Sequence, residues 1–396
     1  MKIMLFLEHS FYVNNLGQIF CEKVINNDYL KRYTDVFEEV IICARKNDEL
    51  KSFIDEPLEN VKLLPLPNYN ANQLLLKMHK IVNYIGKNIK DVKGIILRAP
   101  SSLSVVGYNV ANKYNIPFIS EIVINPNYLF DLSQGNIVRR YINRVGRLIL
   151  VNHTKKICLE SAGVSYVTEN ALQQQFPSNR KKYGDSSTQY ETYYSSINLK
   201  EEHYSTEISN RNQDDEFIIV HTGWMVGYNK GHMEVIDVVK KLIDKGYKIK
   251  AYFIGDGPLK SELENYSNSL GVLNNICFTG KLNSFNDIQK ILKKSHLFVF
   301  PSQIEGLPRA VIEAMANSLP CIASNIDGMD ELLDKDFLFE LENTEQIVKL
   351  IESFINNEDQ RIKQGKINYN KAQKYHYDIL SAKRRNFYIQ FKKNVQ

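Results

Sequence analysis

The chain has 396 residues, of which 43% are hydrophobic and 24% charged, and its formal net charge at pH 7 is +5. This length exceeds one ordinary domain and favours two domains of roughly 200 residues each. The mild charge and the lack of a recognised nucleic-acid motif exclude a nucleic-acid partner. No apolar run approaches the roughly 20 residues that a membrane-spanning helix needs.

The cysteines and the first residues indicate a cytoplasmic protein. The five cysteines are scattered, odd in number and without a CxxC pair, which favours reduced thiols over a disulfide framework or a zinc site. The opening residues MKIMLFLEHS are too short and end too polar for a signal peptide, and they are typical of a first strand.

The first half alternates short apolar runs with helical spacing, which predicts βαβ units and a parallel sheet. The expected strands are Lys2–Glu8, Glu39–Cys43, Val61–Leu64, Gly94–Arg98, Ile116–Val123 and Val164–Val167. The expected helices are Leu16–Lys31, Asn72–Ile89, one after Ser101 and one near Glu169. The loop His9–Gly17 is then expected at the ligand-binding end of this sheet.

Residues Ile137–Lys156 predict an amphipathic helix with a basic side. Its apolar stripe is Ile137, Val138, Tyr141, Ile142, Val145, Leu148 and Ile149, and arginines 139, 140, 144 and 147 crowd the other side. Two interpretations remain open. The stripe packs against the core and the basic face is solvated, or the helix lies on an anionic membrane surface.

The segment from about Pro177 to Glu216 is polar and rich in Tyr and Ser, which predicts the connection between two domains. Regular alternation then resumes and predicts a second doubly wound sheet. The expected strands are Phe217–His221, Lys248–Ile254, Ile276–Thr279, Leu297–Phe300 and Cys321–Ala323. The expected helices are Gly231–Lys245, Leu259–Leu270, Phe285–Lys293, one from about Leu307, and helical sequence from Thr344 to the end.

Two carboxylates stand out in the stretch Pro301–Glu331, which follows a buried strand. Glu305 lies in the loop after the strand, and Glu313 is expected about two turns into the next helix, roughly 12 Å along its axis. Such a strand-to-helix junction is where parallel α/β sheets bind ligands. The span suits a ligand with two polar ends, although either Glu alone is also typical of an ordinary helix surface.

The combination is more specific, and it resembles the signature of the retaining family-4 glycosyltransferases of the GT-B fold. The matching features are two Glu separated by seven residues, Gly306, Ala-Met-Ala, and Pro-Cys-Ile-Ala-Ser. The resemblance implies two doubly wound Rossmann-like α/β domains facing a central cleft. The expected divisions are residues 1–195 on the acceptor side, 196–375 for the nucleotide-sugar, and a helix at 376–396 that returns to the first domain.

The resemblance also implies an activity. It is the retaining transfer of a hexose-type sugar from a UDP- or GDP-sugar to a glycan or lipid-linked acceptor, in bacterial surface polysaccharide assembly. The enzyme is expected in the cytoplasm, at the inner face of the cell membrane if Ile137–Lys156 contacts it. Neither a metal ion nor another cofactor is expected, since the nucleotide-sugar is a substrate.

The loop Gly223–Gly231 leaves the first strand of the second half and enters a helix, where backbone amides attract phosphate. The family places an Arg, five residues and then Lys-Gly here to hold the donor diphosphate. Lys230 and Gly231 match this pattern, but Trp224 occupies the Arg position, and an indole cannot neutralise a phosphate. Arg309 is either the substitute cation or a surface arginine, and both interpretations remain open.

Roles for the other site residues follow from the same resemblance. Glu313 is expected to bind the ribose hydroxyls and Glu305 the donor sugar, while Lys230 stabilises the departing diphosphate. The remaining donor-binding candidates are the backbones of Gly306, Leu307, Gly17, Lys281 and Leu282.

On the acceptor side the candidates are His9, as a hydrogen-bond donor or a loop residue without a role, and Glu121. The carboxylate of Glu121 either lines the acceptor site or forms a salt bridge. Two other functions remain open. One is a non-catalytic GT-B subunit that binds a partner transferase or an acceptor, motivated by Trp224 and the sparse glycines around Gly17. The other is a sugar-nucleotide epimerase.

Overall fold

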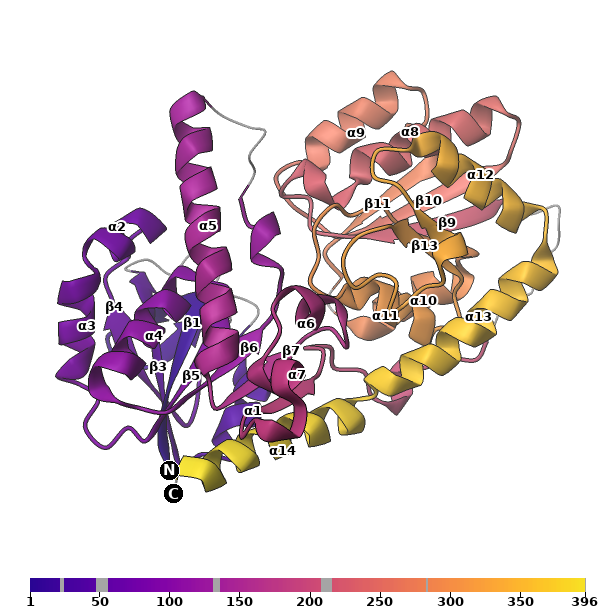
Figure 1. Ribbon diagram of the computed structural model, residues 1–396. Coiled ribbons are helices and arrows are strands. Elements are labelled where there is room, and N and C mark those ends of the chain that lie inside the picture. The colour runs from indigo at the N-terminus through magenta and orange to yellow at the C-terminus, as the bar shows by residue number, and fades with distance from the viewer. Residues whose placement is uncertain (22–24, 48–55, 131–135, 208–215, 283, 396) are drawn as a thin grey trace. The chain divides into compact units, whose positions relative to one another are not determined.

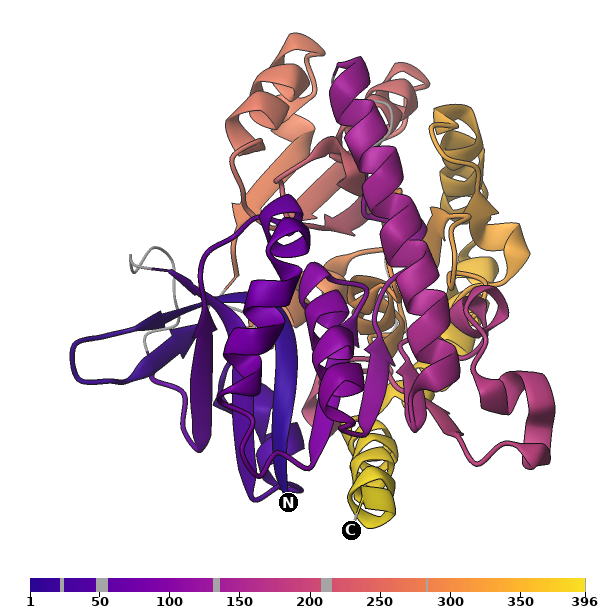
Figure 2. The same ribbon diagram turned by 60° about the vertical axis from the view of Figure 1, so that its left-hand side comes forward.

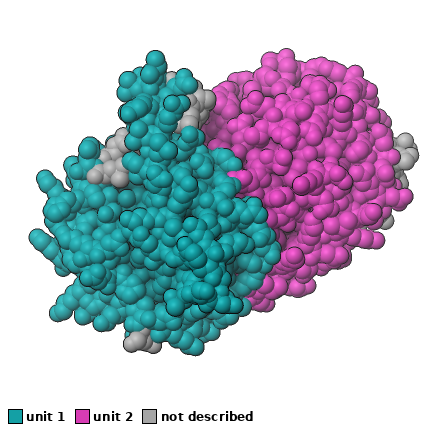
Figure 3. Space-filling model, in the orientation of Figure 1, with its two compact units in different colours: residues 1–194, 381–396 teal, residues 195–380 magenta. Residues whose placement is uncertain are grey.

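The computed structural model describes residues 1–21, 25–47, 56–130, 136–207, 216–282 and 284–395. The chain forms two compact units, coloured separately in Figure 3. The first comprises residues 1–194 and 381–396, and the second residues 195–380. The sequence places the divisions at residues 195 and 375. The charged run at 210–216 is one reason to expect the connection between the two domains here. Most of this run lies outside the described residues.

The first unit is built on an eight-stranded sheet, counted over the described residues, in the order β4-β3-β1-β5-β6-β7-β8 with β2 beside β1. All pairs are parallel except β1 with β2. The strands are β1 (Lys2–Val13), β2 (Ile19–Cys21), β3 (Glu39–Asn47), β4 (Val61–Leu66), β5 (Gly94–Ala99), β6 (Phe118–Ile122), β7 (Gly163–Tyr166) and β8 (Tyr190–Tyr193). Strand β8 lies inside the segment expected to be a linker.

Helices pack on this sheet, as Figures 1 and 2 show. They are α1 (Asn27–Thr34), α2 (Ala71–Leu76), α3 (Met78–Gly86), α4 (Ser102–Tyr114), α5 (Ile137–Glu160), α6 (Ala171–Gln175) and α7 (Asn179–Tyr183). Helix α4 starts at a capping box in which the Ser101 hydroxyl accepts from the Ser104 amide. A Cβ at Gly107 of α4 would lie 2.5 Å from Leu97 and 2.8 Å from Phe6, so this glycine lets α4 approach the sheet closely.

The helix expected at Leu16–Lys31 is wrong. Strand β1 continues through His9 to Val13 and pairs with β2 as a hairpin, and a helix begins only at Asn27. The hairpin turn is fixed by Asn14, whose side-chain oxygen accepts from the amides of Leu16 and Gln18 at 3.0 and 2.9 Å. Gly17 follows at φ +78°, in the exposed part of this turn.

The apolar stripe of α5 is exposed. Its seven residues are between 37% and 84% accessible, so the core-packing interpretation is wrong for this part of the helix. At about 100° per residue they fall within an arc of about 140°. The residues of α5 that the unit buries are His153, Thr154, Ile157 and Cys158, and they lie roughly on the opposite side. Over the described residues, no helix has the length and apolar content to cross a membrane.

The second unit contains a six-stranded parallel sheet, over the described residues, in the order β11-β10-β9-β12-β13-β14. Its strands are β9 (Phe217–Thr222), β10 (Ile249–Ile254), β11 (Ile276–Gly280), β12 (Leu297–Phe300), β13 (Cys321–Ser324) and β14 (Leu338–Phe339). Its helices are α8 (His232–Asp244), α9 (Lys260–Ser269), α10 (Phe285–Lys294), α11 (Arg309–Ala316), α12 (Thr344–Ile355) and α13 (Glu358–Ala372). Each predicted strand agrees within two residues, because runs buried on both faces of a parallel sheet are strongly apolar.

The last helix, α14 (Tyr377–Val395), begins in the second unit and packs on the first from Ser381 onward. Lys392 donates to the Val36 carbonyl and to the Glu38 carboxylate, both at 3.2 Å. The Tyr388 hydroxyl donates to Glu121 of β6. Both ends of the chain therefore contribute to one folded unit.

Candidate active site

The two carboxylates of Pro301–Glu331 follow β12 in the second unit. Residues 301–308 form a loop, and α11 begins at Arg309 rather than at Leu307. Glu305 lies in the loop, and Glu313 is the fifth residue of the helix. Glu313 therefore lies fewer than the expected two turns into the helix, because Pro308 is extended and the helix begins only after it. Gly306 and buried Leu307 lie between Glu305 and this start.

Lys230 and Glu305 form an ion pair that joins two loops at the carboxyl end of the sheet. The Lys230 ammonium lies 2.6 Å from the Glu305 carboxylate, and the side chains are 24% and 18% exposed. The Ser302 hydroxyl donates to the same carboxylate oxygen at 2.9 Å. The pair is screened from bulk water enough to hold its geometry, yet it remains open to a ligand.

Glycines allow these loops to approach each other. Gly231, directly after Lys230, has φ +78°, and a Cβ there would lie 2.4 Å from the Pro301 carbonyl oxygen. Gly255, after β10, has φ +141°, and its Cβ would lie 2.0 Å from the Gly223 carbonyl oxygen. No other residue type fits at either position without moving backbone. The two glycines thus bring the ends of β9, β10 and β12 together.

Glu313 has a different environment. It is half-buried, and its carboxylate has no hydrogen-bond partner within the described parts of the chain. Burial raises the pKa of Glu313 to about 7, and only the nearby Arg309 opposes this. Arg309 is exposed, four residues earlier on the same helix face. Its charge therefore lowers the pKa of Glu313, and both interpretations of Arg309 remain open.

Two buried histidines, which the sequence analysis did not single out, pack next to Gly223 at the start of the loop that carries Lys230. His221 of β9 and His232 of α8 pack edge to face, with ring centroids 4.5 Å apart. A Cβ at Gly223 would lie 3.3 Å from His232 and 3.5 Å from His221. Burial lowers the pKa of His221 well below its usual range and that of His232 to about 4. Both rings are neutral at pH 7. The signal for them in the sequence is Gly223, which follows the strand that carries His221 and opens the loop that ends before His232.

Trp224 lies in the same loop and is 50% exposed. It brings no charge to the position where the family has an Arg. At the end of β11, Gly280 has φ +70° and its carbonyl accepts from the Gly255 amide at 3.2 Å. Lys281 and Leu282 follow directly, one exposed and one half-buried. These candidates therefore lie beside the loop after β10, at the same edge of the sheet as Lys230.

The first-unit candidates lie on different elements, His9 on β1, Gly17 in the turn before β2 and Glu121 on β6. His9 is within β1, not in a loop, and burial together with Arg98 lowers its pKa, so it is neutral at pH 7. Gly17 is in the hairpin tip, where a Cβ would have no neighbour within 4 Å. Among the described residues, no backbone therefore approaches Gly17 closely enough to exclude a larger side chain.

Glu121 is 3% exposed and does not line an open site. Its carboxylate accepts from Arg98 and Tyr33 at 3.1 Å, from Tyr194 at 3.3 Å, and from Tyr388. These donors come from four elements and occupy the oxygens. The salt-bridge interpretation is the correct one, and the acceptor role is withdrawn: Glu121 joins α14 to the first sheet.

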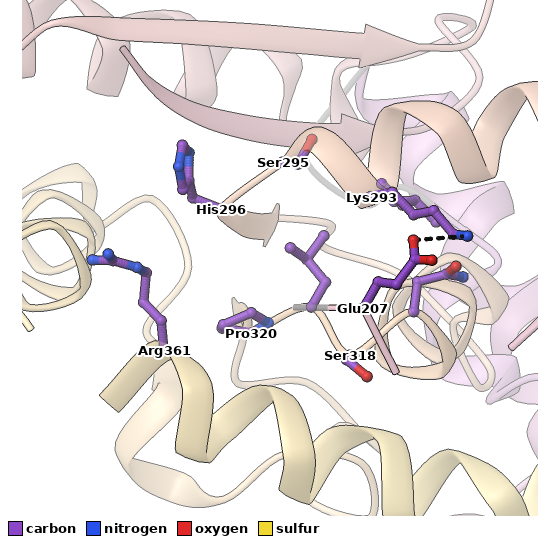
Figure 4. Close-up of a pocket in the computed structure, with 10 residues that line it drawn as sticks. Glu207, Lys293, Ser295, His296, Ser318, Pro320 and Arg361 are labelled. Atoms are coloured by element: carbon purple, nitrogen blue, oxygen red, sulfur yellow. Dashed lines mark ion pairs between the residues drawn. The ribbon is translucent and has the colours of Figure 1, made fainter. Parts of the chain in front are cut away.

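A cavity at the opposite end of the second sheet is too small for a sugar. Figure 4 shows this cavity, beside the residues that precede β12 and β13, with the ion pair Glu207–Lys293 at 3.2 Å along it. Its volume of about 20 Å³ holds little more than one water molecule. The carboxyl end therefore carries the candidate site.

Sequence comparison relates part of the chain to a known family. A model of the group 1 glycosyl transferases matches residues 205–371. This stretch of the second unit is therefore similar to a group 1 glycosyl transferase domain. The chain is 26% identical to Protein CapJ of Staphylococcus aureus over 402 residues, covering 99% of this chain and 97% of that protein. The UDP-Gal:alpha-D-GlcNAc-diphosphoundecaprenol alpha-1,3-galactosyltransferase of Escherichia coli is 40% identical over 107 residues, 26% of this chain and 25% of that enzyme.

Solved structures agree on the fold. HepE of Anabaena, in complex with UDP and glucose, superposes with a TM-score of 0.65 at 15% identity, covering 100% of this chain and 99% of HepE. The chain has the two parallel-sheet α/β domains of the GT-B fold. The matched group 1 domain contains Lys230, Glu305 and Glu313.

Proposed function

We propose that this protein is a retaining family-4 glycosyltransferase that moves a hexose-type sugar from a UDP- or GDP-sugar to a glycan or lipid-linked acceptor. The observation that carries the proposal is the Lys230–Glu305 pair at the carboxyl end of the second sheet, followed along the chain by half-buried Glu313 on α11. A cation beside two separated carboxylates suits a donor with a diphosphate, a sugar and a ribose. Gly306 and Leu307 lead into α11, where backbone amides attract a phosphate.

The proposed chemistry breaks the bond between sugar C1 and the diphosphate and forms a bond from C1 to an acceptor oxygen on the same face. The acceptor proton passes to the departing phosphate. Lys230 stabilises the negative charge that develops on the diphosphate, and Arg309 supplies the cation that Trp224 lacks. Glu305 accepts hydrogen bonds from the sugar, and Glu313 from the ribose. No metal ion takes part, so EDTA should leave turnover unchanged.

We place this activity in bacterial surface polysaccharide assembly, in the cytoplasm at the inner face of the membrane. The similarity to Protein CapJ and to an Escherichia coli enzyme that acts on a diphosphoundecaprenol-linked sugar supports this proposal. The exposed apolar and basic sides of α5 support a membrane contact.

The test is a panel of UDP- and GDP-sugars with the full-length protein, followed by the release of nucleoside diphosphate. Turnover of one donor, lost in Lys230→Ala, supports the proposal. Exposed Trp224 motivates the second candidate, a non-catalytic subunit. That candidate gains support if no donor is bound or turned over. Conversion of the donor to its epimer without acceptor would instead identify an epimerase.

A further inference from the structure

A groove of about 550 Å³ lies within the first unit, next to the edge strand β4. It is lined by Lys46 near the end of β3, by the last residues of β4 and those that follow it, and by side chains of α3. Arg45 of β3 pairs with Leu66 of β4, so Lys46 and Pro67 come next at the carboxyl edge of the sheet. The volume falls within the range of small-molecule sites, and the position is where parallel sheets bind ligands.

Three lysines border this groove, namely Lys46, Lys77 and Lys80. None of them forms an ion pair with a carboxylate of the described residues, and no described carboxylate lines the groove. Some other lysines of this unit are paired with a carboxylate, as Lys62 is with Glu39 at 3.0 Å. Among the described residues, the groove therefore concentrates positive charge that no carboxylate balances, which favours a ligand with an anionic group.

Two tyrosines add ring surfaces. The Lys77 ammonium lies 4.1 Å from the centre of the Tyr69 ring, an arrangement that holds both side chains. The Tyr84 hydroxyl donates to the Pro65 carbonyl at 3.3 Å, which orients a ring that is 42% exposed. Leu66 and Ile81 are buried beneath, at 1% and 5% exposure. Aromatic faces over an apolar base suit a ring-shaped ligand.

We propose that this groove is the acceptor-side site for an anionic saccharide, a sugar ring that bears a phosphate or a carboxylate. The lysines bind the anionic group, and Tyr69 and Tyr84 contact the ring. The inference deepens the proposed function and rests on it, because it names the class of acceptor that the transferase takes. It assigns substrate selection to the part of the first unit around β4 and α3.

Titration calorimetry of the full-length Lys230→Ala variant tests this directly, because that substitution removes phosphate binding at the proposed donor site. The probes are glucose 1-phosphate, glucuronic acid, methyl glucoside and inorganic phosphate. Glucose 1-phosphate, glucuronic acid or both should bind. Binding of only one of them would show whether the groove takes a phosphate or a carboxylate. Neutral glucoside and inorganic phosphate should bind at least about tenfold more weakly, since each lacks one of the two contacts.

Lys77→Ala with Lys80→Ala should weaken the anionic sugars about tenfold or more. The matched control, Lys87→Ala with Lys90→Ala, removes two exposed lysines of the same region and should change nothing. Equal loss in both double variants would overturn the proposal, as would glucoside or inorganic phosphate binding as tightly as the sugar phosphate. Because the readout is binding in a Lys230 variant, failure of the donor panel leaves this result interpretable.

Discussion

Glu305 and Glu313 belong to one sequence signature but have opposite surroundings. Glu305 accepts from Lys230 at 2.6 Å and Ser302 at 2.9 Å, whereas Glu313 is near only the charge of Arg309. The first carboxylate is held in place before any ligand arrives. The second carboxylate has its lone pairs available. A hydroxyl of a bound ligand would therefore give this half-buried carboxylate a hydrogen-bond partner, which it lacks among the described residues.

The two carboxylates should therefore respond differently to truncation. Glu313→Ala should weaken UDP or GDP binding about tenfold to a hundredfold, because hydrogen bonds to a charged group are lost. Glu305→Ala should leave nucleotide affinity nearly unchanged and reduce sugar transfer about a hundredfold or more. Calorimetry with nucleoside diphosphates and a transfer assay measure the two effects. Glu358→Ala, an exposed change on α13, is the control, and nucleotide binding like the parent in both site variants would contradict the assignment.

Nucleotide affinity should also depend on pH through Glu313. With its pKa raised to about 7 by burial, the side chain is ionised at pH 8 and mostly protonated at pH 6, where it loses acceptor capacity. Affinity should therefore fall between pH 8 and pH 6, and this fall should be absent in Glu313→Gln. A parent and variant with parallel profiles would show that another group titrates.

The same shift has a consequence for stability with the opposite sign. The folded protein holds the Glu313 proton more tightly than the unfolded chain, so the contribution of Glu313 to stability is present in full below pH 4.5 and is lost as pH rises through about 7. Glu313→Gln should consequently raise the free energy of unfolding at pH 8 by up to about 3 kcal/mol. At pH 4.5 the variant and the parent should differ little in urea titrations.

At the scale of elements, α5 presents a surface that the first unit does not cover. Its stripe is up to 84% exposed at Ile137, and the helix has no acidic residue before Glu160. Apolar side chains with arginines beside them match an anionic bilayer surface, where the stripe enters the interface and the arginines meet the headgroups. An acidic lipid surface is therefore the expected occupant.

Vesicle co-sedimentation tests this. The parent should bind vesicles that contain phosphatidylglycerol and not vesicles of phosphatidylcholine alone. Replacing Ile137, Tyr141 and Leu148 together with Glu should lower the partition coefficient about a hundredfold or more. The control replaces Leu16 and Leu76 with Glu. These two side chains are 83% and 86% exposed elsewhere in the unit, so the control should bind the vesicles like the parent. Unchanged binding by the triple variant would assign the stripe to another partner, such as a protein.

Elements of the second unit follow closely from the sequence, and β12 was predicted to the residue, because strands buried on both faces leave an unbroken apolar run. The β1–β2 hairpin was missed because strand pairing and the Asn14 turn compete with local helical spacing. The sequence does not decide whether the apolar stripe of α5 is exposed, since the same amphipathic pattern is typical of a helix that packs on a core and of a helix that lies on a membrane. The role of Glu121 depends on donors at positions 33, 98, 194 and 388, which no local pattern brings together.

At the scale of the whole molecule, the C-terminal helix makes the first unit depend on the last residues of the chain. Tyr388 is fully buried and donates to Glu121, and Phe391 is also buried. A Cβ at Gly94 of β5 would lie 2.6 Å from the Phe391 ring. The first unit is therefore complete only after the second has been synthesised.

Tyr388→Phe should destabilise the first unit by about 1–3 kcal/mol, because a buried carboxylate loses one of its donors. The second unit should keep its stability. The single tryptophan of the chain, Trp224, lies in the second unit, so its fluorescence follows that unit during urea unfolding, while amide hydrogen exchange in β5 and β6 follows the first. UDP, if bound as proposed, should shift only the fluorescence transition.

The matched control is Tyr183→Phe, which removes a hydroxyl that is exposed on the same unit and should alter neither readout. The decisive comparison is between the two probes in Tyr388→Phe. Faster exchange in β5 and β6 with an unchanged fluorescence midpoint means that α14 stabilises the first unit alone. A fluorescence midpoint that falls by the same free energy would mean instead that both units unfold as one, and the independent contribution of α14 would have to be abandoned.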